Sequence, residues 1–325
     1  MVTVSVIIPT YNYANYICQA IDSALQQIFD GYIEIIVVDD GSTDDTQNAL
    51  SKYIADGSIK YFYQENKGKA AATSFAIRQS SGEFIFNLDA DDLFMPGKIS
   101  RSVAVFQSDI SIVHVASPAK IVFQNTGLFE VENIPVGIMD KAIDGNWLLQ
   151  YFYNSNIIFG GGTTYAARAS VLKKILIPDA VDMFIDEFLI VAVLPFGKSF
   201  IVPVPLSIWR VHQNNYSVGE SSAGQKQKKA RRLMCSSDAL LSYFKNNDFK
   251  KPLVKLYKLK NSTGAITLLE NERQKNILHI FSYAFKTFIV LRPSWQQIKK
   301  YHVINRLIPT SMFRILKSIV HAPKS

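Results

Sequence analysis

Short β-branched runs alternate with segments of helical periodicity through the first third of the chain. The strand-like runs are Val4 to Ile8, Ile33 to Val38, Ile59 to Tyr63, Phe84 to Leu88 and Ile112 to Val115. Apolar residues recur at helix spacing from Ile17 to Ile28, and Ser42 followed by Asp45 is typical of a capping box that opens a second helix. This alternation predicts an α/β fold with a Rossmann-like, mainly parallel sheet and flanking helices.

Three of the predicted strands run into polar clusters at their carboxyl ends. The clusters are Thr10-Tyr11-Asn12, Asp39-Asp40-Gly41-Ser42 and Asp89 to Asp92. Ligands of open α/β sheets bind beyond the carboxyl ends of the strands, so the three clusters predict one site on one rim. Helical patterns near Asn146 to Tyr153, Arg168 to Ile175 and Phe184 to Phe196 predict a second half of the domain, which we expect to hold the other substrate.

Charge divides the chain near Ser221 to Lys229. Residues 1 to 225 contain 14 Lys and Arg against 23 Asp and Glu, a net of −9, whereas residues 226 to 325 contain 21 against 4, a net of +17. We therefore expect a catalytic domain over residues 1–220 and a helical, basic C-terminal region over residues 221–325.

The basic region contains two amphipathic patterns. The first places Ile277, Phe281, Ala284, Phe288 and Leu291 on one helical face, and the second does the same with Met312, Leu316 and Ile319. Such faces suit the anionic inner leaflet of a membrane, so peripheral membrane contact is one expectation. Packing on the catalytic domain, or on another subunit of a homo-oligomer, is the alternative. No nucleic-acid module is recognisable, which disfavours a nucleic-acid partner.

Cysteine usage and hydropathy predict a cytoplasmic protein. Cys18 and Cys235 lie far apart without ligand spacing, so no disulfide framework is expected. Met1 leads directly into the first strand without a basic leader, which predicts that there is no signal peptide. The apolar run from Ile277 to Leu291 is too short to span a bilayer and contains Lys286, so we expect no transmembrane helix.

Asp89, Asp91 and Asp92 place three carboxylates within four residues at the end of a predicted buried strand. Acids this close raise one another's pKa unless a cation or solvent offsets the charge. Mg²⁺ or Mn²⁺ can do so while accepting carboxylate and phosphate oxygens together, which predicts a site for a nucleotide diphosphate. The alternative is a solvated acidic turn or helix cap, since Pro96 indicates a helix that begins shortly afterwards.

Five segments follow one another in a fixed order along the chain. They are Val4 to Asn12 (VSVIIPTYN), Val37 to Asp44 (VVDDGSTD), Asn66-Lys67-Gly68, Gly82-Glu83-Phe84 and Asp89-Ala90-Asp91-Asp92. Together they resemble the nucleotide-diphospho-sugar domain, of GT-A fold, found in family 2 inverting glycosyltransferases. The resemblance covers roughly the first two thirds of the chain, and the ordered set is far more specific than any one motif.

The resemblance implies a nucleotide site built from the first two clusters. Pro9, Thr10 and Tyr11 would border the nucleoside, and Asp40 would accept a hydrogen bond from the base. Asp39 could exchange roles with Asp40, because successive residues at a strand end point in opposite directions. A tight turn followed by a helix cap is the alternative for this pair. The family analogy favours uridine diphosphate as the carrier.

The third cluster is implied to hold the metal. Asp91 would be the direct metal ligand, Asp89 would lie nearer the ribose or the metal, and Asp92 would cap or orient. Lys67 or Lys69 could face the diphosphate, although exposed lysines are commonly just solvated.

Transfer also calls for a carboxylate within hydrogen-bond reach of the acceptor hydroxyl. Asp186 is the candidate, because it opens an apolar helix where the family has an acid-Asp pair. In this chain Ile185 replaces the first acid and Glu187 follows, so Glu187 and Asp182 remain alternatives. These acids would also favour a helix N-terminus without any catalytic role.

A later segment, Trp209 to Ser217, resembles the part that closes the donor pocket in many relatives. Arg210 could contact phosphate with its planar fork, and His212 could face the diphosphate or the metal. Gly160 to Thr164 lies where relatives shape the acceptor cleft. The chain has no Q-x-x-R-W signature of processive synthases, which favours addition of a single sugar.

These observations lead to one main hypothesis and two alternatives. The main hypothesis is a Mn²⁺- or Mg²⁺-dependent inverting glycosyltransferase that moves one sugar from a nucleotide diphosphate sugar to a hydroxyl of a glycan or lipid-linked glycan, as in cell-surface polysaccharide synthesis, at the cytosolic membrane face. A nucleotidyltransferase would need a Gly-rich basic loop after the first strand, where this chain has Pro9-Thr10-Tyr11-Asn12. The other alternative is an inactive protein of this fold that binds membranes or partners.

Overall fold

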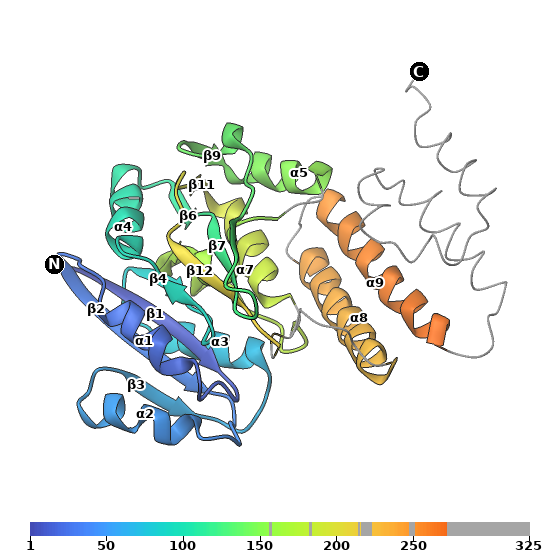
Figure 1. The fold of residues 1–325 in the computed structure, drawn as a ribbon. Coiled ribbons are helices and arrows are strands. Elements are labelled where there is room, and N and C mark those ends of the chain that lie inside the picture. Colours follow the sequence, from blue (N-terminus) through green and yellow to red (C-terminus); the bar gives the residue numbers. More distant parts are fainter. Residues whose placement is uncertain (156–157, 182–183, 214, 216–222, 247–250, 272–325) are drawn as a thin grey trace. The chain divides into compact units, whose positions relative to one another are not determined.

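The computed structural model describes residues 1–155, 158–181, 184–213, 215, 223–246 and 251–271. The strands of its larger sheet are β1 (Val2–Thr10), β2 (Gly31–Asp39), β3 (Lys60–Tyr63), β4 (Phe84–Asn87), β6 (Ile112–Ala116), β9 (Ala142–Asp144), β10 (Ala166–Arg168) and β11 (Lys198–Ile201). They are arranged in the order β3-β2-β1-β4-β10-β6-β11-β9. Figure 1 labels all of these strands except β10. A smaller sheet contains β5 (Leu93–Phe94), β7 (Ala119–Phe123), β8 (Phe129–Val131) and β12 (Ser207–Val211), in the order β5-β12-β7-β8.

Helices cover both faces of the larger sheet. They are α1 (Ile17–Leu25), α2 (Thr46–Ala55), α3 (Lys69–Gln79), α4 (Lys98–Ser108), α5 (Gly145–Ser155), α6 (Ala169–Leu172) and α7 (Ile185–Val193), with 3-10 turns η1 (Val136–Ile138), η2 (Gly162–Thr164) and η3 (Leu194–Phe196). Apolar residues of α1, α2 and α4 form one core with Val4, Val6 and Ile8 of β1, while α3 packs against β1 and β2. The predicted α/β fold with flanking helices is confirmed.

The sheet is parallel in its first half and mixed in its second. β1 pairs in parallel with both β2 and β4, so the polar residues that follow these strands lie on one rim. β10 then enters between β4 and β6 and runs antiparallel to both. The sequence gave no sign of β10, because a strand of three residues with two fully buried alanines, Ala166 and Ala167, has too little pattern to recognise.

The second helix begins later than the predicted capping box implies. α2 starts at Thr46, with Asp45 preceding it, and the predicted Ser42 cap is wrong. The Ser42 hydroxyl instead accepts a hydrogen bond from the Asn12 amide at 2.9 Å, and the Ser42 amide donates to Asp39. Ser42 therefore ties the loop after β1 to the loop after β2, which shapes the rim of the sheet rather than the helix.

The chain divides into two compact units. The first comprises Met1–Leu149 and Ile158–Gly219, and the second contains the end of α5 together with α8 (Ala223–Asn246) and α9 (Lys251–Asn271). α8 and α9 pack on each other, with the rings of Phe244 and Tyr257 centred 5.2 Å apart. A Cβ at Gly264 would lie 3.0 Å from the carbonyl oxygen of Ala230, so glycine permits this close approach.

The basic C-terminal region is described only in part, which limits what can be said of its predicted helices. The amphipathic patterns from Ile277 to Leu291 and from Met312 to Ile319 lie outside the described residues. Within the described part of the chain, none of the helices combines the length and the apolar character that crossing a bilayer requires.

Candidate active site

The acidic segment, Asp89 to Asp92, follows β4, and its three carboxylates point in different directions. The amide of Asp92 donates to the carbonyl of Asp89 at 3.0 Å, which folds the segment into a tight turn. Asp91 and Asp92 are buried, with 8% and 4% of their surface exposed, and Asp89 is half-buried. Each carboxylate then contacts a different part of the chain.

Asp89 faces Lys69, the first residue of α3. The Lys69 ammonium lies 3.0 Å from Asp89 Oδ1 and 3.3 Å from each carboxylate oxygen of Asp186, in the first turn of α7. One cation therefore bridges the acidic segment and the candidate base. Burial lowers the pKa of Lys69, but Asp186 and Asp89 outweigh it and hold that pKa above its ordinary value.

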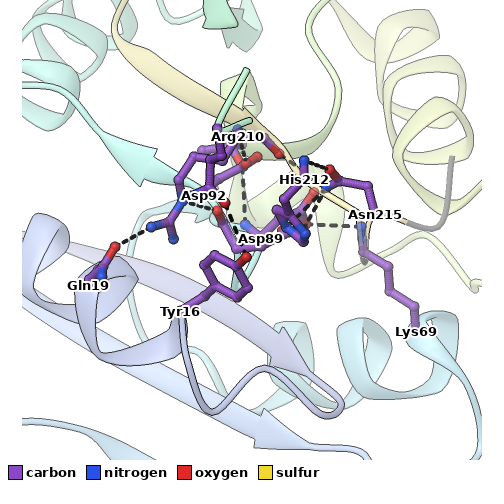
Figure 2. Close-up of polar contacts among 11 residues, drawn as sticks. Tyr16, Gln19, Lys69, Asp89, Asp92, Arg210, His212 and Asn215 are labelled. Atoms are coloured by element: carbon purple, nitrogen blue, oxygen red, sulfur yellow. Dashed lines mark hydrogen bonds and ion pairs between the residues drawn. The ribbon is translucent and has the colours of Figure 1, made fainter. Parts of the chain in front are cut away.

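Asp91 faces the segment after β12. Its Oδ2 lies 3.2 Å from His212 Nε2 and accepts a hydrogen bond from Asn215 Nδ2 at 3.1 Å (Figure 2). Burial raises the pKa of the Asp91 carboxyl, and Asp89 adds to this, while Lys69 and His212 act in the opposite direction. Burial and the neighbouring Asp89 therefore both disfavour the ionised form of Asp91.

Asp92 is held by two structural partners. Its Oδ2 accepts a hydrogen bond from the Thr163 hydroxyl at 2.5 Å, and its Oδ1 accepts one from the Arg210 amide at 3.0 Å. Burial, and then Asp89 and Asp91, raise the pKa of Asp92 well above its ordinary value. The orienting role expected for this residue stays a prediction.

Arg210 is buried behind the acidic segment. Its Nε donates to the Asp91 carbonyl and its Nη1 donates to the side-chain oxygen of Gln19, while the guanidinium lies 4.9 Å from the centre of the Tyr16 ring (Figure 2). With 4% of its surface exposed, it supports the turn of Asp91 and Asp92 directly. Its expected contact with phosphate stays a prediction.

Aromatic residues from the loop after β1 pack on His212. The rings of Tyr16 and His212 are stacked with centroids 4.4 Å apart, and the Tyr13 ring meets His212 edge-on at 6.4 Å. Burial, with Asp91 and Asp89, raises the pKa of the Tyr13 phenol, so it stays protonated. The stack and the contact with Asp91 together fix the orientation of the imidazole.

The residues predicted to bind the nucleoside lie at the ends of β1 and β2. Thr10 is buried and Tyr11 is 43% exposed, and the amide of Asp40 donates to the Thr10 carbonyl at 2.9 Å. The Asp39 carboxylate accepts hydrogen bonds from the Ser42 amide and from the Tyr61 hydroxyl, at 2.8 and 3.0 Å. Pro9 precedes Thr10 in β1.

Asp40 organises the loop that leads into α3. Its carboxylate accepts hydrogen bonds from the amides of Lys67 and Gly68, at 2.9 and 2.8 Å, and from the Gln64 side chain at 2.7 Å. The Lys67 side chain is exposed. Of the two lysines considered, Lys69 is the one that the structure brings to the acidic segment.

A glycine-rich turn borders the candidate base. A Cβ at Gly161 would lie 3.2 Å from the Cβ of Asp186, and one at Gly162 would lie 3.3 Å from Asp89 Oδ2. The two glycines therefore leave space beside both acids. Glu187 shares the first turn of α7 with Asp186, and Asp182 lies outside the described residues.

Sequence reasoning gave no role to several residues that hold this site together. Thr163, Asn215, Tyr16 and Gln19 all contact the acidic segment or its supports. They are ordinary polar and aromatic residues far from Asp91 in sequence, so only the fold brings them together. Asn215 and Thr163 belong to segments already noted by resemblance, Trp209 to Ser217 and Gly160 to Thr164, and those segments were the available signals.

Comparison with known proteins agrees with this architecture. The profile described as Glycosyl transferase family 2 matches residues 5–176. An uncharacterised glycosyltransferase of Nostoc sp. strain PCC 7120 is 31% identical over 228 residues, which is 69% of this chain and 69% of that protein. The chain therefore belongs to glycosyl transferase family 2, and it is a glycosyltransferase of the nucleotide-sugar type.

Solved structures share the fold at low sequence identity. S. aureus TarS, residues 1–349, in complex with UDP has a TM-score of 0.57 at 17% identity, over 96% of this chain and 91% of that one. A mannosyltransferase from Pyrobaculum calidifontis in complex with GDP-Man and Mn²⁺ has a TM-score of 0.52 at 18% identity, over 96% and 86%. At these identities the likeness concerns the fold alone, and it supports the predicted GT-A type.

Proposed function

We propose that the protein is a metal-dependent inverting glycosyltransferase that moves a single sugar from a UDP-sugar to a hydroxyl of a glycan or lipid-linked glycan. The observation that carries this proposal is the Lys69 ammonium shared by Asp89 and Asp186. It joins the candidate metal-binding segment to the candidate base, 97 positions later in the sequence. Donor activation and acceptor activation would then take place in one site.

The residues of the acidic segment fit a metal that is completed by the substrate. Among the described residues, no group of three or more acidic, histidine or cysteine side chains is arranged to enclose a metal ion. Mg²⁺ sites in nucleotide enzymes are commonly built from one or two carboxylates plus phosphate oxygens and water, and Mn²⁺ also favours oxygen ligands. Asp91, with Asp89 two positions before it in the same tight turn, provides such a partial set of carboxylate oxygens.

In this proposal Asp91 is the direct ligand and Asp89 the second, with His212 in contact with Asp91. A bound Mn²⁺ or Mg²⁺ would make the leaving diphosphate less basic as a Lewis acid. A divalent ion would also offset the mutual repulsion of the Asp89 and Asp91 carboxylates.

Asp186 acts as the base in the same proposal. The acceptor hydroxyl would transfer its proton to the Asp186 carboxylate while its oxygen attacks the anomeric carbon on the face opposite the diphosphate, which inverts that carbon. The neighbouring glycines, Gly161 and Gly162, leave room for the acceptor beside this carboxylate. Burial raises the pKa of the Asp186 carboxyl, and the nearby Lys69 ammonium opposes this rise.

The nucleotide would occupy the rim formed by the ends of β1 and β2. Pro9, Thr10 and Tyr11 are proposed to border the nucleoside, and Asp40 or Asp39 to accept from the base. Lys67, Arg210 and His212 are proposed to act on the diphosphate side. UDP is favoured as carrier, in line with the UDP bound by TarS, although the mannosyltransferase neighbour binds GDP-Man.

A nucleotide-sugar panel tests this proposal directly. We expect the full-length protein to release UDP from one donor in the presence of Mn²⁺ or Mg²⁺, and to lose this activity in EDTA and in Asp91→Asn. Asp30→Asn, which changes an exposed acid of the same type, is the matched control and should stay fully active. Turnover that is unaffected by both EDTA and Asp91→Asn would contradict the metal-dependent mechanism.

The base is tested by a pair of neighbouring variants. Asp186→Asn should reduce transfer to the acceptor by about 10²- to 10⁴-fold, because general-base catalysis contributes about that much. Glu187→Gln, in the same helical turn, should retain most activity. The reverse pattern would assign the role to Glu187.

The proposed place at the cytosolic membrane face rests on the basic C-terminal region. Deletion of residues 226–325 tests it, because the truncated chain should keep donor hydrolysis and lose vesicle binding. Equal vesicle binding by the truncated and full-length chains would contradict a membrane role for this region.

A further inference from the structure

Lys98 is a fully buried lysine that contacts the turn containing Thr163 and Thr164. It is the first residue of α4 and has 0% of its surface exposed. Its ammonium donates to the backbone carbonyl of Thr164 at 2.7 Å and lies 5.9 Å from the centre of the Phe94 ring. A carbonyl oxygen and an aromatic ring are weak compensation for the hydration that a buried ammonium loses.

Packing alone does not explain why a lysine occupies this buried position. Burial alone lowers the pKa of Lys98 to about 7, which means that the folded protein disfavours the charged form. A methionine of similar length would fill the same space without losing the hydration of an ammonium. Residues that lower stability in this way are typical of functional sites, where stability is exchanged for activity.

The Thr164 carbonyl belongs to the turn that carries Thr163. The Thr163 hydroxyl donates to Asp92 Oδ2 at 2.5 Å and accepts from the Asp89 amide at 3.2 Å. The Thr163 carbonyl accepts a hydrogen bond from the Ser207 hydroxyl at 2.9 Å. A displacement of this turn would therefore move both acids of the candidate donor site.

The other end of the turn is fixed by His114. Its Nε2 lies 3.2 Å from the Gly160 carbonyl oxygen and its Nδ1 lies 2.8 Å from the Ser199 hydroxyl. Burial lowers the pKa of His114 to about 4, so the ring is neutral and donates to only one of these groups. A Cβ at Gly160 would lie 2.6 Å from the Cβ of Ala116, so no side chain fits at this end of the turn.

We propose that Lys98 is a positioning residue of the transferase site, which holds the Thr164 carbonyl so that Thr163 keeps Asp89 and Asp92 in place. The same turn keeps Gly161 and Gly162 beside Asp186. This inference rests on the proposed roles of Asp89 and Asp186. Lys98 itself acts only through the turn and touches no reacting group.

Lys98→Met in the full-length protein tests the proposal. We expect a melting temperature equal to or above that of the unchanged protein, because the buried ammonium is removed. We also expect kcat for donor hydrolysis to fall between about tenfold and a hundredfold, as for a misplaced catalytic group. KM for the donor should rise as well, because the turn holds Asp89, which is proposed to bind the metal at the donor diphosphate. Full kcat together with a raised melting temperature would overturn the proposal.

A double-variant cycle tests the route through the turn. Thr163→Val removes the hydroxyl that contacts Asp92 and Asp89, and it should lower kcat by a similar factor. If Lys98 acts through Thr163, kcat of the double variant should be close to kcat of the less active single variant. Losses that multiply would show that Lys98 acts by another route and would overturn the proposal.

A second readout separates this proposal from the proposed function. If the unchanged protein hydrolyses no nucleotide sugar, the proposed function fails, and the role of Lys98 is then tested by hydrogen exchange. The amides of Thr164 and Tyr165 donate to the carbonyls of Gly161 and Gly162 in the turn. Faster exchange at these two amides in Lys98→Met would support the positioning role. Unchanged exchange at these amides would overturn it.

Discussion

The ammonium of Lys69 lies 3.3 Å from both carboxylate oxygens of Asp186, although the two residues are 117 positions apart in the sequence. Lys69 begins α3 and Asp186 lies in the first turn of α7, so two helix N-termini meet at this contact. The same ammonium reaches Asp89 at 3.0 Å. The fold thereby brings the acid after β4 and the acid of α7 to one cation.

Loss of the Lys69 cation should impair the chemical step. In Lys69→Met, Asp89 and Asp186 repel each other without a shared counter-ion, so we expect both to move away from their present positions. Donor turnover should fall by about tenfold or more, because small displacements of catalytic groups have effects of this size. Steady-state assays of UDP release at saturating Mn²⁺ measure the change.

Two comparisons make this result specific. Lys52→Met, at an exposed position of α2, should behave like the unchanged protein. Lys67→Met decides between the two lysines that the sequence left open, and its loss should be smaller than that of Lys69→Met. Equal activity of Lys69→Met and Lys52→Met would show that the shared ammonium has no part in the reaction.

The fold could be predicted from the sequence where strands have a strong local pattern. Val4 to Ile8 and Phe84 to Leu88 are mainly apolar runs, interrupted by Ser5 and Asn87, and they coincide with most of β1 and with β4. β10 could not be predicted, because Ala166 and Ala167 owe their strand conformation to the neighbouring strands rather than to their own propensity. The antiparallel pairs with β4 and β6 follow from this insertion, whereas β9 adds a separate antiparallel pair with β11.

The candidate site shows the same division. Asp89, Asp91 and Asp186 stand out in the sequence because acids at the ends of apolar runs are conspicuous. Thr163 and Asn215 do not, since a threonine and an asparagine in loops have many ordinary uses. Their contacts with Asp92 and Asp91 depend on loops that lie 71 and 124 positions away, and a single sequence contains no signal for such pairs.

The stack of Tyr16 on His212 should influence activation by the metal. Tyr16→Leu removes the ring that holds the imidazole, and aromatic pairs contribute about 0.5–1.5 kcal/mol, equivalent to about two- to tenfold in affinity. We therefore expect the Mn²⁺ concentration for half-maximal activity to rise by that factor. Titration of UDP release with Mn²⁺ measures it.

Tyr16→Phe serves as the matched control for the stack. It keeps the ring and loses only the hydroxyl, which donates to Gln124 at 3.1 Å. Its Mn²⁺ titration should resemble that of the unchanged protein. If phenylalanine is as harmful as leucine, the bond to Gln124 matters and the stack does not.

Gly162 should tolerate no side chain. Its φ is +52°, a conformation that costs a residue with a Cβ about 1–2 kcal/mol, and that Cβ would lie 3.3 Å from Asp89 Oδ2. Gly162→Ala should therefore lower both the melting temperature and donor turnover. Gly137→Ala, where a Cβ would meet no atom within 4 Å, is the control. Normal turnover in Gly162→Ala would argue against a functional role for this turn.

Lys98 should make stability depend on pH in a defined window. Its pKa is about 7 in the folded protein and has an ordinary value of 10.5, so the unfolded chain binds more protons between these values. By linkage, the free energy of unfolding contributed by Lys98 rises with pH from about 7 to 10.5 and is constant below pH 7. Lys98→Met lacks this contribution, so the stability advantage of the variant over the unchanged protein should shrink as pH rises. Urea unfolding of both proteins at intervals from pH 6 to 9.5 measures the difference, and Lys52→Met controls for the loss of an exposed lysine. A difference that stays the same across this range would mean that Lys98 titrates normally and that its burial has no electrostatic consequence.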